Sequence, residues 1–195
     1  MRPHHIQLAQ DQQPDKRLQV TQDKLFAALE QIFATGTTFQ TVTVSQLCQR
    51  AGLARQTYYR HYDQVVEILE VQFSRLVNQF LTNVDQTPLS QIDAAPLVVK
   101  QLQANQTLLQ MIQWADAEEG AVMVLVSDMT RVAFINEYHT ELRAFVNEVI
   151  ARSVFGFSRV MLKNPAIDTA TLIRLYALMI PDPGQILNRL DSDNS

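Results

Sequence analysis

Hydrophobic residues recur every three or four positions along most of the chain, and this spacing predicts α-helices. The first such segment opens at Thr21, which can act as an N-cap, and runs to about Thr35. Gly36 follows it, as glycine commonly does just past a helix end. Residues 1–18 are rich in Gln, Asp and Pro and lack periodicity, so we expect a disordered arm there.

Two shorter helices are predicted next, close together. Thr43 and Gln46 have the spacing of a capping box, in which each side chain satisfies a backbone N–H of the other residue. The helix they open ends before Gly52, and a third helix over residues 54–61 follows with almost no linker. Three small helices with a tight glycine turn between the last two predict a helix-turn-helix domain over residues 19–62.

From residue 63 onward the pattern is that of longer amphipathic helices, separated by prolines. These helices are predicted over residues 66–81, 97–114 (two helices or one bent helix), 140–163 and 168–180. The run AVMVLV at 121–126 is rich in β-branched residues, but its polar flanks favour a buried helix over a strand. We therefore expect an all-α protein whose larger helical body spans 63–187, followed by a tail at 188–195.

Composition narrows the possible functions. The single cysteine excludes an internal disulfide framework, and Cys48 falls on an apolar helix face that indicates a core residue. No apolar run approaches the ~18 residues of a membrane span, and the N-terminus lacks an apolar signal segment, so we expect a cytoplasmic protein without membrane contact. Phosphate-binding glycine loops, nucleophile elbows and paired zinc ligands are missing, and the spacing of Cys48, His61 and Asp63 does not require a catalytic set. We expect neither an enzyme nor a metal or cofactor site.

Charge is divided unevenly along the chain. Residues 1–62 hold seven Lys and Arg against four Asp and Glu, a balance of +3. Residues 63–195 hold nine against sixteen, a balance of −7, and the two parts sum to the net charge of −4. A basic N-terminal part on an acidic body predicts that the N-terminal part faces a polyanion.

The third predicted helix carries side chains suited to DNA bases. At about 100° per residue, one side of this helix gathers Arg55, Gln56, Tyr59 and Arg60. Arg can donate two hydrogen bonds to guanine, and Gln can pair with adenine. Thr57 and His61 at the edges of the helix, and Thr43 beside the free N–H groups of the preceding helix, are placed to reach phosphates. The alternative is an ordinary solvated helix face, which the glycine turn and the charge asymmetry disfavour.

Residues 21–69 resemble the DNA-binding domain of TetR-type transcriptional regulators, over about a quarter of the chain. The segments AALEQIFATG, TVSQLCQRAGL and TYYRHY, followed by an aliphatic helix, carry the resemblance. It implies an all-α homodimer, most often a repressor, whose two heads bind a double-stranded DNA operator and whose body binds a small-molecule effector. It also implies base contacts from Arg55, Gln56, Tyr59 and Arg60, and phosphate contacts from Thr43, Thr57, Tyr59 and His61.

The chain departs from the family pattern at three positions. Ser45 and Val65 stand where the family often has Arg and Lys, and the third helix starts at Ala54 instead of Ser or Thr. Fewer cations lower the affinity for phosphates and flatten its salt dependence. The missing cap costs the short helix about 1 kcal/mol. The alternative function is therefore a protein of this fold whose head binds a partner protein instead of DNA.

In the body, the resemblance implies an effector pocket and a dimer interface. For the pocket we expect large apolar residues of the middle helices: Met111, Trp114, Met123, Met129, Phe134 and Tyr138. For the interface we expect one side of the last two helices, with Phe145, Val149, Val154, Phe157, Val160 and Met161. Ordinary core packing is the alternative for both sets, because Met and aromatic residues at helical spacing usually pack inside.

Overall fold

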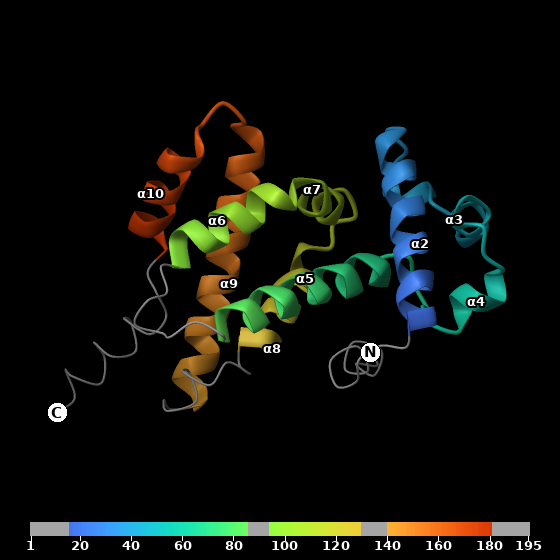
Figure 1. The fold of residues 1–195 in the computed structure, drawn as a ribbon, viewed down its shortest axis with the longest axis horizontal. Helices are drawn as coiled ribbons and strands as arrows, with labels where there is room; N and C mark the ends of the chain where they lie inside the picture. Colours follow the sequence, from blue (N-terminus) through green and yellow to red (C-terminus); the bar gives the residue numbers. More distant parts are fainter. Residues whose placement is uncertain (1–15, 86–93, 130–139, 181–195) are drawn as a thin grey trace.

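The computed structural model describes residues 16–85, 94–129 and 140–180, and all of the regular secondary structure in these ranges is helical. The predicted all-α class is confirmed. With the labels of Figure 1, the helices are α2 (Lys16–Ala34), the short 3-10 helix η1 (Phe39–Thr41), α3 (Val44–Ala51), α4 (Arg55–Tyr59), α5 (Glu67–Asp85), α6 (Ala94–Ala104), α7 (Gln106–Trp114), α8 (Glu118–Met129), α9 (Thr140–Lys163) and α10 (Thr169–Met179). Across these ranges, none of the helices combines the length and the apolar character that crossing a membrane demands.

Helices α2, η1, α3 and α4 lie at one end of the molecule, and we call them the head (residues 16–62). Helices α6 to α10 form the body: α6, α9 and α10 lie at the other end, α7 lies between them and the head, and α5 runs from the head into the body (Figure 1). Most predicted helices are confirmed: residues 97–114 form two helices, 121–126 lie within α8, and α9 has the predicted bounds. The short helix η1 was not predicted, because three residues carry no periodic signal.

Helix α2 begins earlier than the sequence pattern predicted. Thr21 lies inside the helix, where its hydroxyl donates a hydrogen bond to the carbonyl oxygen of Arg17 at 2.9 Å. Thr is a favoured N-cap, but inside a helix it can instead bond to the carbonyl four residues back. The prediction of an unstructured arm up to residue 18 is therefore wrong for residues 16–18, which form the first turn of α2.

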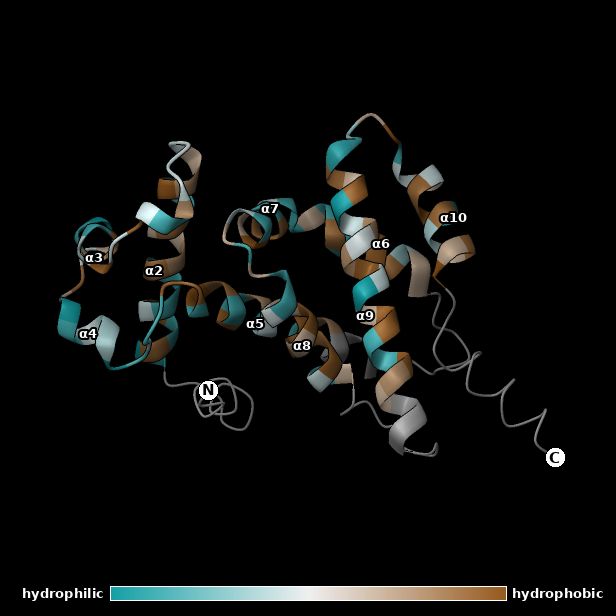
Figure 2. Cartoon of the chain, turned by 180° about the vertical axis from the view of Figure 1, so that it is seen from behind, coloured by the Kyte–Doolittle hydropathy of each residue, from teal (hydrophilic) through white to brown (hydrophobic). Residues whose placement is uncertain are grey.

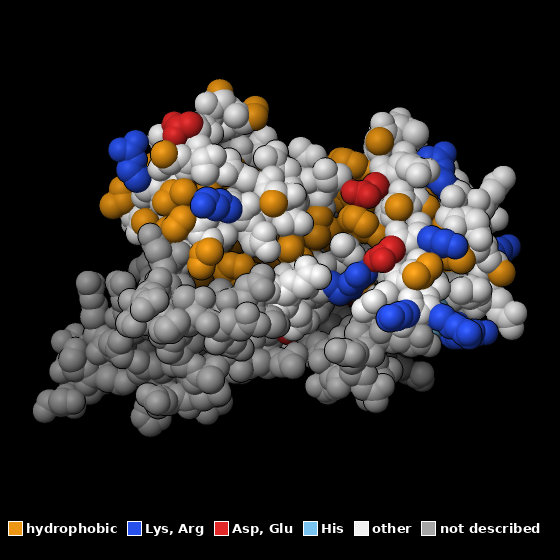
Figure 3. All heavy atoms as spheres, in the orientation of Figure 1, with side chains coloured by type: hydrophobic (Ala, Val, Ile, Leu, Met, Phe, Trp, Pro, Cys, Tyr) orange, Lys and Arg blue, Asp and Glu red, His pale blue; other side chains and the backbone are white. Residues whose placement is uncertain are grey.

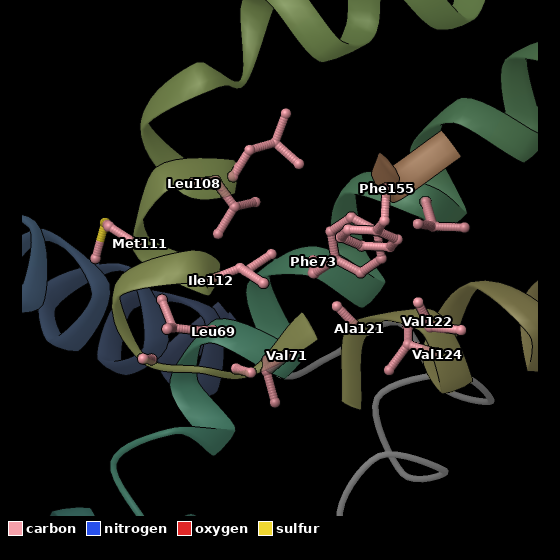
Figure 4. Close-up of a cluster of buried hydrophobic side chains, with 14 of the residues drawn as sticks. Leu69, Val71, Phe73, Leu108, Met111, Ile112, Ala121, Val122, Val124 and Phe155 are labelled. Carbon is pink, nitrogen blue, oxygen red and sulfur yellow. The ribbon is translucent and has the colours of Figure 1, made fainter. Parts of the chain in front are cut away.

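The core is continuous from the head into the body. In the head the fully buried apolar side chains include Leu25, Leu29, Ile32, Leu47 and Tyr58, and Cys48 is buried beside them as predicted. In the body, residues of α5, α7, α8 and α9 meet in the cluster of Figure 4, where the rings of Phe73 and Phe155 lie 5.3 Å apart. Hydrophobic segments dominate α8 and alternate with polar ones along α9 (Figure 2). Both helices keep an outer side, since Met123 of α8 and Phe145 of α9 are exposed.

Two helix ends share one backbone motif. At the end of α3, Gly52 has φ +65°, and the N–H of the following residue, Leu53, donates to Cys48 O at 3.0 Å. At the end of α7 the same pattern of bonds surrounds Asp116, which has φ +52° although it carries a side chain. The left-handed region suits glycine and strains other residues, Asp less than most. The turn after α7 therefore stores strain that the turn after α3 avoids.

Removing the glycine at position 52 and introducing one at position 116 should have opposite effects on the free energy of unfolding. Gly52→Ala should lower the free energy of unfolding by about 1 kcal/mol, because the added Cβ meets no atom within 4 Å and only the backbone strain remains. Asp116→Gly should raise it by up to about 1 kcal/mol. Urea denaturation followed by circular dichroism measures both. A Gly52→Ala protein as stable as wild type would contradict a left-handed residue 52 in solution.

Candidate nucleic-acid interface

Helices α3 and α4 are positioned by their ends. The hydroxyl oxygen of Thr43 accepts a hydrogen bond from the backbone N–H of Gln46 at 3.2 Å, so the predicted N-cap of α3 is confirmed. After the turn at Gly52 the chain enters α4, whose N-cap residue Ala54 makes no side-chain cap bond. Helix α4 has only five residues, and a helix this short is not stable by its own backbone bonds. Packing against the head must hold it in place.

Tyr58 provides that packing. Its side chain is completely buried, and its ring contacts those of Tyr59 (centroids 5.3 Å apart, edge to face) and Tyr62 (5.7 Å). Burial raises the pKa of the Tyr58 and Tyr62 phenols well above the ordinary value, so both stay neutral. Because successive helical residues are about 100° apart, burying residue 58 determines which side chains of α4 face solvent.

Four polar side chains of α4 and its C-cap are exposed while Tyr58 is buried, and we call these four the outer row. The outer row consists of Arg55, Gln56, Tyr59 and Arg60. The predicted outward orientation of these four residues is confirmed, and 53% of the surface of Tyr59 is accessible. Together they offer two guanidinium groups, one carboxamide and one phenol within two helical turns. These groups can donate to and accept from base edges and phosphates.

The flanking residues that were predicted to contact phosphates also reach the surface. Thr43 is exposed at the start of α3, and Thr57 and His61 are half-buried at the edges of α4. The hydroxyl of Thr43 accepts the capping bond and still has a proton to donate. All three positions are accessible at the surface of the head, and a phosphate role for each remains a prediction.

The three departures from the family pattern have visible consequences in the structure. Ser45 is exposed on α3, so the surface there lacks a cation. Val65 is half-buried and packs against the hydrophobic core instead of reaching outward. Ala54 leaves the start of α4 without a side-chain cap. The positive charge of the surface around α4 therefore depends on its remaining Lys and Arg residues.

Sequence reasoning missed two of these basic residues. Lys16 and Arg17 open α2, and this end of α2 lies on the α4 side of the head (Figure 1). Within residues 16–62 the basic side chains are Lys16, Arg17, Lys24, Arg50, Arg55 and Arg60, against the acidic Asp23 and Glu30. Figure 3 shows Lys and Arg side chains gathered over the head. Leu18, which continues the apolar spacing of α2 towards the N-terminus, is the signal that could have placed the two residues in a helix.

The residues predicted to line an effector pocket lie in different surroundings. Met111 is completely buried in the core, and Met129 is half-buried at the end of α8. Met123 is exposed on the outer side of α8, and Trp114 contacts the head. Phe134 and Tyr138 lie outside the described residues. An effector role for this set remains a prediction.

The residues predicted for a dimer interface divide between the two sides of α9. Phe145, Val149 and Val160 are exposed on its outer side. Val154 and Phe157 are half-buried, Phe157 packs edge to face on Tyr176 of α10, and Met161 is buried. Helix α10 adds three exposed apolar side chains that the sequence pattern did not single out: Leu175, Leu178 and Met179.

The Tyr58 hydroxyl is buried without a hydrogen-bond partner among the described residues. Tyr58→Phe should therefore leave the free energy of unfolding unchanged or raise it by up to about 1 kcal/mol, because no bond is lost and a desolvated hydroxyl is removed. Tyr58→Ala should lower it by about 3–5 kcal/mol by leaving a cavity under α4. Urea denaturation of both variants tests this. A clear loss of stability in Tyr58→Phe would mean that the hydroxyl is bonded in solution.

No protein-family model matches the chain, and no curated protein sequence matches it. Two solved structures are similar to it. Lin0861 from Listeria innocua superposes with a TM-score of 0.78 at 28% sequence identity, over 85% of this chain and 92% of that one. The dihydroxyacetone kinase operon activator DhaS superposes with a TM-score of 0.53 at 18% identity, over 86% of this chain and 96% of that one. At that identity the likeness to DhaS shows a shared fold.

Proposed function

We propose that the protein is a sequence-specific DNA-binding regulator of transcription whose helix α4 enters the major groove. The observation that carries this proposal is the outer row of α4, held outward by the buried ring of Tyr58. Helix α3 and the turn at Gly52 precede α4 in the order of a helix-turn-helix, in which the second helix contacts the bases. The basic balance of the head supports the same assignment, since phosphates attract it.

Each group of the outer row has a defined use in this proposal. Arg55 and Arg60 would donate bidentate hydrogen bonds to guanine, and Gln56 would pair with adenine. Tyr59 would offer its hydroxyl to a phosphate. A good bidentate contact to a base contributes about 1–3 kcal/mol of discrimination against the wrong base pair.

We further propose that the regulator is a repressor, released when a small ligand binds the body. The resemblance of the head to TetR-type regulators supports this mode of action. DhaS, whose fold is similar, is an operon activator by name, which supports a role in gene regulation and leaves activation as the competing direction. A ligand acts in either case by preferring one arrangement of the two heads.

We propose that a second copy of the chain binds the outer side of α9 and α10. Phe145, Val149 and Val160 continue along one side of α9, and on α10 Leu178 is 83% exposed. Large apolar side chains exposed together on one side of the molecule mark interaction surfaces. A helix-turn-helix protein that contacts two half-sites is a symmetric dimer, so a self-complementary surface on the body is what this function requires.

The second candidate is a protein of this fold whose head binds a partner protein. The uncharged Ser45 and the inward-packed Val65 favour it, because both remove a cation from the proposed DNA surface. Salt separates the two candidates. Affinity for DNA falls steeply with ionic strength, whereas a head that has lost DNA binding shows none even at low ionic strength.

Removing one guanidinium of the outer row should weaken DNA binding and relax its specificity. With sites selected from a random duplex library by the wild-type protein, Arg55→Ala should lower affinity about 5- to 150-fold and lose its preference at one base pair. Ser45→Arg should tighten binding and steepen the salt dependence by about one phosphate contact. Fluorescence anisotropy across a salt series measures both changes.

The control is Lys100→Ala, which removes an exposed cation from α6 in the body, away from the proposed dimer surface. Its affinity should equal that of wild type. Specific binding that survives in Arg55→Ala would refute the assignment of the outer row. Wild-type protein that selects no site at low salt would favour the partner-binding candidate.

A charge on the outer side of α9 should break the dimer. Phe145→Glu should weaken self-association at least tenfold and keep the fold, because 67% of the Phe145 surface is accessible within one copy. Sedimentation equilibrium measures the association, and circular dichroism measures the fold. Gln110→Glu, on the exposed side of α7, is the control and should remain dimeric. A wild-type protein that is monomeric at micromolar concentration would contradict the proposed interface.

A further inference from the structure

Trp114, at the end of α7, is held by the head. Its indole N–H donates to the carbonyl oxygen of Thr37 at 2.8 Å. Its ring meets Phe33 (centroids 5.3 Å apart) and Phe39 (5.0 Å), both edge to face. Phe33 lies in the last turn of α2 and Phe39 in η1, so the indole sits against both sides of the turn between them. We call these three head residues the indole socket.

The indole socket lies where the orientation of α3 and α4 is determined. The chain leaves η1 and enters α3 at Val44, so the position of the socket affects where α3 starts. Nearer the middle of α2, Arg75 of α5 pairs with Asp23 at 2.7 Å. These two polar contacts add to the apolar packing of α2 against α5. Trp114 holds the end of α2 that continues into the proposed DNA-binding helices.

On the body side, Trp114 is joined by a short strained turn to a helix that is tied to α9. After the turn at Asp116, with φ +52°, helix α8 opens with Glu118 and Glu119. Glu118 pairs with Arg159 of α9, and Glu119 pairs with Arg152 at 2.8 Å. Exposed pairs of this kind contribute little to stability, but they link the start of α8 to α9. Only the short segment 115–117 separates Trp114 from this link.

We propose that Trp114 is a positioning residue that couples the orientation of the head to the body. A shift of α8 along α9 moves the strained turn and seats or unseats the indole in its socket, because packed contacts of this kind switch between discrete arrangements instead of stretching. The consequence for DNA rests on the proposed function, whereas the coupling between body and head does not. In a dimer, the coupling would set whether two heads match two half-sites.

Hydrogen exchange on the full-length protein tests the coupling. Trp114→Phe keeps a ring in the socket and loses the N–H donor, so amides of residues 32–42 should exchange about fivefold faster, the factor that corresponds to about 1 kcal/mol. Amides of α9 should be unchanged. Phe39→Leu should act in the same way. Phe157→Leu, which removes an edge-to-face contact of the same kind between α9 and α10, should not change residues 32–42.

A second pair of variants tests the connection through α8. Glu119→Gln removes a carboxylate that reaches Arg152 from α8, whereas Glu148→Gln removes one that reaches the same guanidinium from within α9. Only Glu119→Gln should speed exchange at residues 32–42, by about twofold. Trp114 is the single tryptophan of the chain, so a red shift of its emission in Glu119→Gln provides an independent readout. Equal behaviour of the two variants would overturn the connection.

DNA binding separates this inference from the proposed function. Trp114→Phe should lower affinity for a duplex with two half-sites about fivefold and leave affinity for a single half-site unchanged, because the outer row is intact. Wild-type protein that binds neither duplex refutes the proposed function, and hydrogen exchange still decides the coupling. Unchanged exchange at residues 32–42 in Trp114→Phe, or equal loss on both duplexes, refutes the coupling.

Discussion

Helix α5 buries apolar side chains in two places at once, and the arrangement of the other helices depends on it. At its start Ile68 and Leu69 are fully buried, and Leu69 lies near Met111 and Ile112 of α7 in Figure 4. Further along, the ring of Phe73 packs against Phe155 of α9. Burying side chains of this size contributes about 1.5–3 kcal/mol each, so displacing α5 lowers stability. Helix α5 also packs against α2 of the head, and head and body are therefore two parts of one packed unit.

This packing explains how a five-residue helix can present a defined surface. Helix α4 lacks a side-chain cap and is too short to be stable alone. The buried ring of Tyr58 anchors α4 by packing into the head, while the outer row stays exposed. Arg55, Gln56 and Arg60 are exposed, whereas the ring of Tyr59 also packs on Tyr58. Specificity can therefore change at the first three positions at little cost in stability, and at Tyr59 only with the loss of that ring contact.

Caps, glycines and apolar spacing predicted most of the helices, but not what each helix packs against. The cap at Thr43 and the glycine at Gly52 delimited α3 because both signals act through the nearest backbone groups. The start of α2 was misplaced because the hydroxyl of Thr21 can satisfy either an N-terminal N–H or a carbonyl four residues back. Only the apolar spacing through Leu18 shows that Thr21 lies inside the helix and does not cap it. That signal is weak because Leu18 lies in a polar segment.

By itself, the sequence determined the all-α class and the outward side of α4, since both follow from the 3.6-residue helical period. It could not determine which apolar residues of a long helix are buried, because periodicity identifies an apolar face but not the helix that packs against it. On α9 the structure turns Met161 inward and leaves Phe145 outside. It likewise brings Trp114 to Thr37, far from it in sequence, because tertiary packing alone places an indole N–H beside that carbonyl.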